Sequence, residues 1–279
     1  MRKAEELFFK ILMIVASVLI VGGFFLIVGT ILIKGLPALS LDLITKTPGG
    51  GFYMGKEGGV LNAIVGSLYI ALGSSGLALI LSLPIVLYIN VYLKRSSKLG
   101  SIARLSSDVL FGIPSIVYGA FGFTVMIYFG LKTSLLGGIL TVTLLVLPIM
   151  IRTMDEVIRT IPKELLDASY SLGSTRLEAS KILIRQSIPG IFTAILLSFG
   201  RGIGDVASVM FTAGFSDNIP TSIDSPAPTL PLAIFFQLGS PVDEVQARAY
   251  ASALVLTIIV LLISIGARTL SKRFSKNKI

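Results

Sequence analysis

Long apolar runs separated by short polar segments dominate the chain. Each of six runs holds about 20 mostly apolar residues, the length that crosses the hydrocarbon core of a bilayer as one α-helix. The first run lacks a small-residue cleavage site and exceeds a signal-peptide core, so it is expected to stay as a helix. The pattern therefore predicts an all-α integral membrane protein with six spans, at residues 11–33, 60–93, 105–129, 134–151, 191–214 and 249–267.

The polar segments divide the chain. Residues 34–59, with Pro37, Pro48 and a glycine run at 49–51, are expected to form a loop. Within the Pro- and Ser-rich loop 215–245, the apolar piece 230–238 is too short to cross and is expected to be a re-entrant or surface helix. Pro84 is expected to kink the second span. The predicted units are an N-terminal helix and loop at 1–59, a transmembrane domain at 60–270 with a polar loop at 152–190, and a basic tail at 271–279.

Lys and Arg residues lie unevenly on the two sides of the predicted spans. Of the 24, 18 fall in the N-terminal segment, the loops after the second and fourth spans, and the C-terminal tail. Five fall on the opposite side, and Arg201 lies inside a span. Because cytoplasmic segments carry the excess of Lys and Arg, both termini and the loop 152–190 are predicted to be cytoplasmic.

The composition argues against several classes of chemistry. The chain is 53% hydrophobic with a mean hydropathy of +0.89, well above a soluble domain. It contains no Cys and no His, so disulfides, zinc sites and histidine proton shuttles are not expected, and no metal, cofactor or catalytic residue is predicted. It has no G-x-x-x-x-G-K-[ST] motif for a nucleotide. The net charge of +9 follows the predicted cytoplasmic segments, which favours membrane orientation over nucleic-acid binding.

The most polar stretch between two spans reads PKELLDASYSLGSTRLEASKILIRQSIPGI and begins at Pro162. Pro162 suits the first turn of a helix, and Glu164 and Asp167 are favourable near its positive N-terminus. Gly173 offers a C-terminal stop, and a second helix is expected to end against the Pro-Gly pair at 189–190. The prediction is a short amphipathic helix, a glycine turn and a helix that returns to the membrane.

This stretch resembles the coupling loop of ABC importer permeases, in which Glu-Ala-Ala, three residues and Gly precede Ile-x-Leu-Pro. Asp167, Ala168 and Ser169 stand at the Glu-Ala-Ala positions and Gly173 matches, whereas residues 185–186 depart from Leu-Pro. On this stretch alone, an ordinary amphipathic loop remains an alternative. The resemblance implies contact with a cytoplasmic ATPase through Glu164, Asp167, Ala168, Ser169 and Gly173.

Arg201 lies inside the fifth predicted span, where a charge costs at least about 2.5 kcal/mol. Polar residues around it recur at spacings that share one helix face: Ser198, Arg201, Asp205, Ser208 and Thr212. One interpretation is an Arg–Asp pair that only neutralises itself. The other is a path for a tetrahedral or carboxylate anion, because a guanidinium donates two hydrogen bonds to an oxyanion, while Asp205 orients it or favours a protonated anion.

Three further residues have two interpretations each. Arg152 at the end of the fourth span either extends to the interface or belongs to the path. Asp108 is expected at the interface or paired with Arg104. Ser115 follows Pro114, which bends the third span, so the bend serves either packing or the path. The predicted translocation path comprises Arg201, Asp205, Ser198, Ser208, Ser115 and Arg152.

The segment Gly112-Ile113-Pro114-Ser115-Ile116-Val117-Tyr118-Gly119, the triplet at 151–153 and the Arg-x-x-x-Asp pattern resemble the phosphate-specific (Pst) permeases. Short external connections and the Pro-rich loop before the last helix favour the PstA-type subunit over the PstC-type. The resemblance implies the six-helix MetI-like fold of type I ABC importer permeases in the bacterial cytoplasmic (inner) membrane. It also implies as partners a PstC-like second permease, a PstB-like ATPase dimer, an external PstS-like phosphate-binding protein, the lipid bilayer and inorganic phosphate.

Rival functions remain open at this stage. A close alternative to phosphate import is the same architecture importing another oxyanion, such as molybdate or sulfate. A secondary anion carrier would explain the charges inside the membrane but not the cytoplasmic glycine-hinged helix. A purely structural membrane protein explains neither Arg201 nor the polar stripe.

The predicted orientation is testable by cysteine labelling, since the chain has no native Cys. Cysteines replacing Lys98, Arg176 or Lys276 are expected to resist an impermeant thiol reagent added outside, because these positions lie in Lys- and Arg-rich segments. Cysteines replacing Lys46 or Asp224 are expected to react. Labelling of Arg176→Cys from outside would contradict the orientation.

Overall fold

The computed structural model describes residues 2–49, 57–94 and 96–275, and regular structure in these ranges is helical apart from one isolated bridge between Pro48 and Gly58. The predicted glycine run at 49–51 and basic tail at 271–279 lie partly outside the described residues. The helices are α1 (Arg2–Gly35), η1 (Leu36–Ala38), α2 (Leu41–Thr45), α3 (Leu61–Leu87), the π-helix η2 (Tyr88–Tyr92), α4 (Lys98–Phe111), α5 (Ser115–Tyr128), α6 (Leu135–Arg159), α7 (Lys163–Ser171), α8 (Arg176–Ile203), α9 (Leu230–Leu238) and α10 (Asp243–Ser275).

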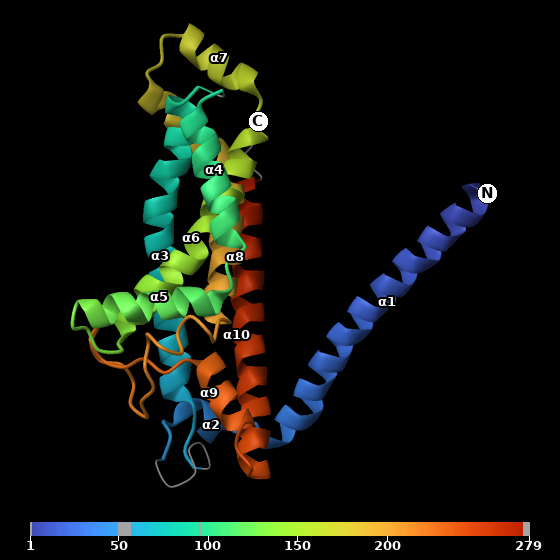
Figure 1. The fold of residues 1–279 in the computed structure, drawn as a ribbon, viewed down its shortest axis with the longest axis vertical. Coiled ribbons are helices and arrows are strands. Elements are labelled where there is room, and N and C mark those ends of the chain that lie inside the picture. The colour runs from blue at the N-terminus through green and yellow to red at the C-terminus, as the bar shows by residue number, and fades with distance from the viewer. Residues whose placement is uncertain (1, 50–56, 95, 276–279) are drawn as a thin grey trace.

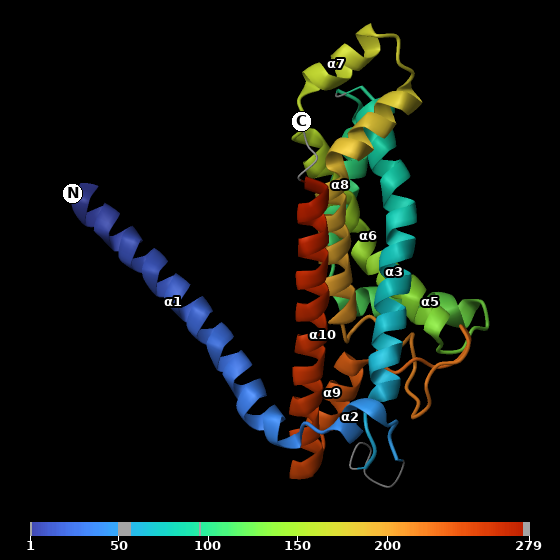
Figure 2. The same cartoon turned by 180° about the vertical axis from the view of Figure 1, so that it is seen from behind.

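Four long helices, α3, α6, α8 and α10, run along the molecule as an upright bundle (Figure 1). The short helix α7 stands at one end of this bundle, and α2 and α9 lie at the other end (Figure 2). Within the described residues, five helices are long and apolar enough to cross a membrane, and six if the bent pair α4–α5 counts as one span. This agrees with the six predicted spans.

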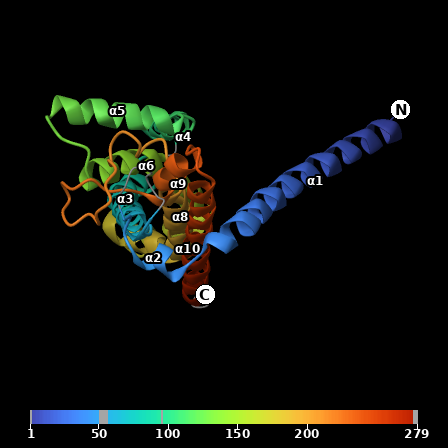
Figure 3. The same ribbon diagram turned by 90° about the horizontal axis from the view of Figure 1, so that it is seen from below.

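Helix α1 leaves the bundle and projects outward from its end near α2 (Figure 3). It meets the rest of the chain near its C-terminus, where the Lys34 ammonium lies 5.0 Å from the centre of the Tyr250 ring. None of its most apolar 18-residue window is buried within the subunit. In a membrane its apolar surface therefore faces lipid or another subunit.

The core lies where α6 packs between α3 and α8. Val142, Val146, Met150 and Met154 recur at every fourth position of α6 and are all fully buried. Residues four apart share a helix face, so this row forms one continuous apolar stripe. The fourth predicted span is confirmed and continues beyond residue 151 to Arg159.

The third predicted span is not one straight helix. It is broken into α4 and α5, whose axes differ by 101° (Figure 1). Pro114 has no N–H to donate, and its ring clashes with the preceding turn of a helix. The ring also disfavours the helical conformation for the residue before it, so α4 ends before Pro114. Gly119 of α5 then packs closely on the backbone of residues 207–208, where an added Cβ would lie 2.6 Å from the Ala207 carbonyl oxygen.

The fifth predicted span is wrong at both ends. Helix α8 does not begin after the Pro-Gly pair at 189–190 but runs unbroken from Arg176 through it, and α8 ends at Ile203 rather than near residue 214. Gly190 allows α8 to pack tightly against Val157 of α6, so tertiary packing outweighs the N–H that proline lacks. At the other end, Gly204 and Asp205 stop the helix.

The other predicted helices are present with shifted boundaries, and the predicted loop 34–59 also contains η1 and α2. The second span is α3 with Pro84 inside it, followed by the π-helix η2 up to Tyr92. The piece 230–238 forms α9, which is largely buried and capped by the Thr229 side chain. The last helix begins at Asp243, six residues before the predicted boundary at 249.

The close contact of α5 with residues 207–208 predicts a stability difference between two glycines. Gly119→Ala is expected to destabilise the protein by about 1–3 kcal/mol, because the added methyl group overpacks a backbone contact. The same change at Gly76, an exposed position of α3 with open space around it, should be neutral or slightly stabilising. Thermal unfolding of the two variants in detergent measures the difference. Equal transitions would contradict the packing of α5.

Candidate functional site

The predicted coupling loop forms a rigid helical hairpin at one end of the bundle (Figure 1). Helix α7 begins directly after Pro162 and closes with two backbone bonds, from the Gly173 N–H to the Tyr170 carbonyl (2.9 Å) and from the Ser174 N–H to the Ser169 carbonyl (3.2 Å). This pattern is a Schellman motif and requires a left-handed residue, here Gly173 at φ +82°. The predicted glycine stop is confirmed.

The chain enters α8 through a second cap immediately afterwards. The Thr175 N–H donates to the Glu178 carboxylate at 2.7 Å, and the Glu178 N–H donates to the Thr175 hydroxyl at 3.4 Å. This reciprocal capping box fixes the start of α8. Two adjoining caps leave the turn between α7 and α8 little conformational freedom.

The predicted coupling residues divide by exposure. Glu164, Asp167, Ala168 and Gly173 are exposed, whereas Ser169 is buried and its hydroxyl bonds to that of Ser174. Ser169 therefore supports the hairpin from within. Leu172 is 90% exposed at the tip, so the loop presents an apolar knob next to its acidic residues. An exposed leucine at this position is not expected from an amphipathic pattern, because apolar residues of such a helix usually face the protein.

Arg201 lies in the last turn of α8, next to the break. Its side chain is 50% exposed, whereas the side chain of Asp205 is 4% exposed, and their nearest nitrogen and oxygen are 3.8 Å apart. The other Asp205 oxygen, Oδ2, accepts the Ser208 N–H at 2.8 Å. Asp205 thus caps the turns that follow the break, and the guanidinium of Arg201 remains open to the outside of the subunit.

The predicted single polar stripe is not formed. Ser198 and Arg201 belong to α8, whereas Asp205, Ser208 and Thr212 lie beyond its end in irregular helical turns. Glycines 202 and 204 weaken the helix there, and an Asp favours a capping position over a helix interior. The break brings these residues to one place by folding rather than by helical spacing.

Two hydroxyls near the break have no hydrogen-bond partner in the described part of the chain. They belong to Ser198 and Ser208, which are both fully buried. The Thr212 hydroxyl donates to the Ser208 carbonyl at 2.9 Å. Ser115 is half-buried at the start of α5, one turn before Gly119, which packs on Ser208. The break region thus gathers Arg201, Asp205, Ser198, Ser208 and the α5 turn that begins at Ser115.

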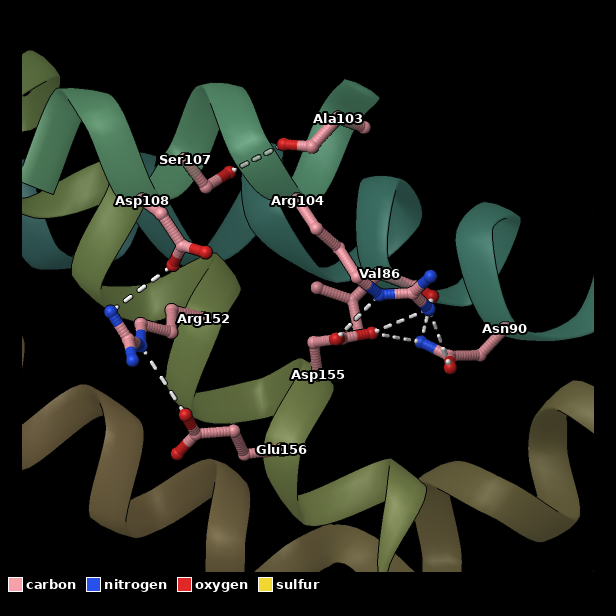
Figure 4. Close-up of polar contacts among 9 residues, drawn as sticks. All are labelled: Val86, Asn90, Ala103, Arg104, Ser107, Asp108, Arg152, Asp155 and Glu156. Carbon is pink, nitrogen blue, oxygen red and sulfur yellow. Dashed lines mark hydrogen bonds and ion pairs between the residues drawn. The ribbon is translucent and has the colours of Figure 1, made fainter. Parts of the chain in front are cut away.

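Arg152 lies at a different level of the bundle from Arg201. Its guanidinium contacts Asp108 at 3.1 Å and Glu156 at 3.2 Å (Figure 4), and lies 5.6 Å from the centre of the Phe111 ring. Gly202 packs on Val142, ten residues before Arg152 on α6, which corresponds to about 15 Å along a helix. Arg152 and Arg201 are therefore not parts of one cluster, and the expected pairing of Asp108 with Arg104 is wrong.

Arg104 pairs instead with Asp155, a residue that the sequence did not single out. The Arg104 Nε and Nη2 donate to the two Asp155 oxygens at 2.8 and 3.2 Å, and Asn90 Nδ2 donates to Asp155 Oδ1 at 2.7 Å (Figure 4). Asp155 had been placed in a polar loop, whereas it lies on the buried face of α6, one helical turn after Ile151. Its place on the stripe with Ile151 and Ile158 was the available signal.

The long apolar helices, the bent pair α4–α5 and the protruding hairpin after α6 are features of a multi-pass membrane protein. The family described as "Binding-protein-dependent transport system inner membrane component" matches residues 81–277, and the chain belongs to this family. Its members are permeases rather than enzymes, and the family implies an ATPase and a second permease as partners. The chain is thus a multi-pass inner-membrane protein.

Curated relatives and a solved structure agree with this assignment. The chain is 36% identical over 249 residues to the phosphate transport system permease protein PstA of Xylella fastidiosa (strain 9a5c), covering 88% of this chain and 84% of that protein. It is 34% identical over 252 residues to the same-named protein of Pasteurella multocida (strain Pm70), covering 88% and 87%. A chain of the methionine ABC transporter MetNI, in an inward-facing crystal form, matches with a TM-score of 0.65 at 18% identity, over 77% of this chain and 95% of that one. This likeness shows the fold alone, and it confirms the predicted MetI-like permease fold.

The geometry of the hairpin predicts different effects for two substitutions of Gly173. Gly173→Val is expected to loosen the α7–α8 turn, because left-handed backbone costs a residue with a Cβ roughly 1–2 kcal/mol. Gly173→Asn should be tolerated, since Asn adopts this conformation more readily and no atom lies within 4 Å of the added Cβ. Co-purification of the ATPase measures the effect: reduced for Val and retained for Asn. Equal ATPase recovery with both variants would contradict a docking role for the turn.

Proposed function

We propose that this chain is the PstA-type permease subunit of an ATP-driven importer of inorganic phosphate and forms half of the translocation path. The observation that supports this most strongly is the open guanidinium of Arg201 beside a buried Asp205. Asp205 uses one oxygen to cap the chain and lies too far from Arg201 for a hydrogen bond. Arg201 is therefore not saturated within the subunit, which argues against a purely self-neutralising pair.

The membrane environment restricts what can cover Arg201. A half-exposed guanidinium inside a span is costly against lipid and is accommodated where it faces protein or a water-filled path. The family supplies a second permease, and we propose that Arg201 faces the path between the two subunits. There its planar fork suits a passing oxyanion. Asp205, being buried, orients Arg201 rather than contacting the anion, and the buried Ser198 and Ser208 contribute to the same region.

Phosphate is the cargo that the relatives' names support. The geometry of Arg201 also suits another tetrahedral oxyanion, so sulfate and molybdate remain the rival cargoes of the same machine. A secondary anion carrier has no support from the family or from the exposed hairpin. The proposed specific partners are a PstC-like permease, a PstB-like ATPase dimer that binds α7, and an external PstS-like phosphate-binding protein. We also propose that both termini are cytoplasmic. We propose that the chain consists of an N-terminal helix and loop at 1–59, a transmembrane domain at 60–270 and a basic tail at 271–279.

A charge-balanced double variant separates anion binding from pairing. Arg201→Met with Asp205→Asn removes both charges, while the Asn side chain keeps the oxygen that caps the Ser208 N–H. If Arg201 binds phosphate, uptake should fall about 10- to 100-fold, the equivalent of one charge-assisted hydrogen bond. Arg201→Lys should be intermediate, because it keeps the charge without the fork. Uptake of radioactive phosphate into proteoliposomes that contain the complete transporter measures the effect.

Asp205→Asn alone keeps the capping bond and removes only the acid that orients Arg201, so its uptake should fall less than that of the double variant. Co-purification of the second permease verifies that each variant assembles. Competition by unlabelled phosphate, sulfate and molybdate identifies the cargo in the same assay. Near-normal uptake by the assembled double variant would contradict the role of Arg201 while leaving the family assignment intact.

A further inference from the structure

A buried ionic joint connects three segments at the α7 end of the bundle (Figure 4). Asp155 of α6 accepts hydrogen bonds from Nε and Nη2 of Arg104 and from Nδ2 of Asn90. Arg104 Nη2 also donates to the Asn90 side-chain oxygen Oδ1 at 3.4 Å, so the three side chains form a closed ring of contacts. The Asp155 side chain is 8% exposed and that of Arg104 is 28% exposed. The three residues are called the ionic joint below.

The third member of the joint lies in the π-helix that follows α3. Asn90 belongs to η2, and its Nδ2 also donates to the Val86 carbonyl at 2.9 Å. π-Helical turns are rare and are frequently found at functional sites. The joint therefore connects the π-helical end of α3 to α4 and α6.

The ionic joint lies at the base of the coupling hairpin. Asp155 is one turn from the end of α6, and the chain continues from Arg159 through Pro162 into α7. A cavity of about 280 Å³ separates the joint from the hairpin, and its walls include Asn90, Arg104, Arg159, Asp167 and Tyr170. A displacement of α7 thus reaches Asp155 through a short, continuous piece of backbone.

The other end of α4 leads to the anion region. Helix α4 continues from Arg104 to Phe111, where the chain bends into α5. Gly119 of α5 packs on Ala207 and Ser208, inside the turns that Asp205 caps. Two helices joined by the bend at residues 112–114, α4 and α5, therefore connect the joint to the neighbourhood of Arg201.

Buried and exposed ion pairs differ in what they contribute. A buried, fully bonded pair adds little net stability over apolar residues but fixes the register of the elements that it joins. In the neighbouring ion pairs, the side chains of Arg152, Asp108 and Glu156 are 46%, 52% and 65% exposed. Ion pairs this exposed contribute little to the free energy of folding. A gain in folding stability therefore does not explain why Asp155 is buried. The fixed arrangement of α4, α6 and η2 that its hydrogen bonds maintain does explain it.

We propose that Asp155 is a positioning residue that transmits movement of α7 through Arg104 and α4 to the break beside Arg201. The inference rests on the proposed function, since it assumes that α7 receives the ATPase and that Arg201 lies on the anion path. It assigns to the joint the coupling between ATP hydrolysis and anion passage. Neither ATPase docking nor anion binding needs Asp155 directly.

The test removes the joint without leaving a buried charge. In the variant Arg104→Leu with Asp155→Leu, the complete transporter is expected to assemble and hydrolyse ATP. The ratio of phosphate taken up to ATP hydrolysed should fall at least about fivefold, the lower range for coupling between linked sites. Glu156→Gln, which changes an exposed carboxylate on the next residue of the same helix, is the matched control and should keep the normal ratio.

A distance measurement provides a readout that altered folding alone does not reproduce. Spin labels on cysteines replacing Leu172, at the hairpin tip, and Ile116, exposed on α5, report whether the two ends move together. With the joint intact, their distance distribution should be narrow with and without a non-hydrolysable ATP analogue. In the double leucine variant it should broaden when the analogue is bound.

The outcomes separate the joint from the anion site. A normal uptake ratio and a narrow distribution in the double leucine variant would overturn the proposal. Loss of ATP hydrolysis together with uptake would assign Asp155 to docking and would also overturn it. Failure of the Arg201 role gives a different result: the variant Arg201→Met with Asp205→Asn then keeps near-normal uptake, while the double leucine variant still shows the lowered ratio and the broadened distribution.

Discussion

Irregular backbone inside a membrane has to be shielded from lipid and hydrogen-bonded within the protein, and this constraint organises the subunit. The chain leaves the helical path at two points inside the bundle, at residues 112–114 and at 204–213. The two breaks are packed together through Gly119. The carbonyls of residues 212 and 213 accept N–H groups of Ser134 and Ala227 at 3.0 and 2.8 Å. The irregular turns are therefore fixed by their surroundings, and such a fixed segment is what precise presentation of Arg201 requires.

The same constraint divides the charges of the bundle into two kinds. Asp155 is buried and is neutralised by Arg104, whose side chain is 28% exposed. Arg201 stays open although its nearest acid is four residues away, because that acid is occupied with the backbone. Because the subunit does not pair the guanidinium of Arg201 fully, a partner from outside the subunit best explains its charge. The proposed division of labour follows: Arg201 meets the anion, α7 meets the motor, and the ionic joint connects the two regions.

The sequence predicted most strongly those features that depend on local physics. Apolar length predicted the spans, and the row from Val142 to Met154 needed only helical periodicity. Gly173 was predictable because a helix stop of this kind needs a left-handed residue. The breaks were harder, since Pro114 ends a helix whereas Pro189 does not, and only packing around each proline decides between the two outcomes. The ionic joint was not predictable from spacing, because Arg104 and Asp155 are separated by 51 positions in the sequence.

The central claim is that the break beside Arg201 faces the anion path, and site-directed thiol chemistry tests it most directly. Gly204 is exposed three residues after Arg201 in ordinary right-handed backbone, so a cysteine fits there. In the assembled transporter, Gly204→Cys should react with a charged methanethiosulfonate reagent, and phosphate should slow the reaction. Gly22 is exposed on α1 in the isolated subunit, and no atom lies within 4 Å of an added Cβ. In the membrane, lipid or a neighbouring helix covers this position, so Gly22→Cys should not react. A Gly204→Cys that is as unreactive as Gly22→Cys in every nucleotide state, or whose reaction phosphate does not slow, would contradict the account.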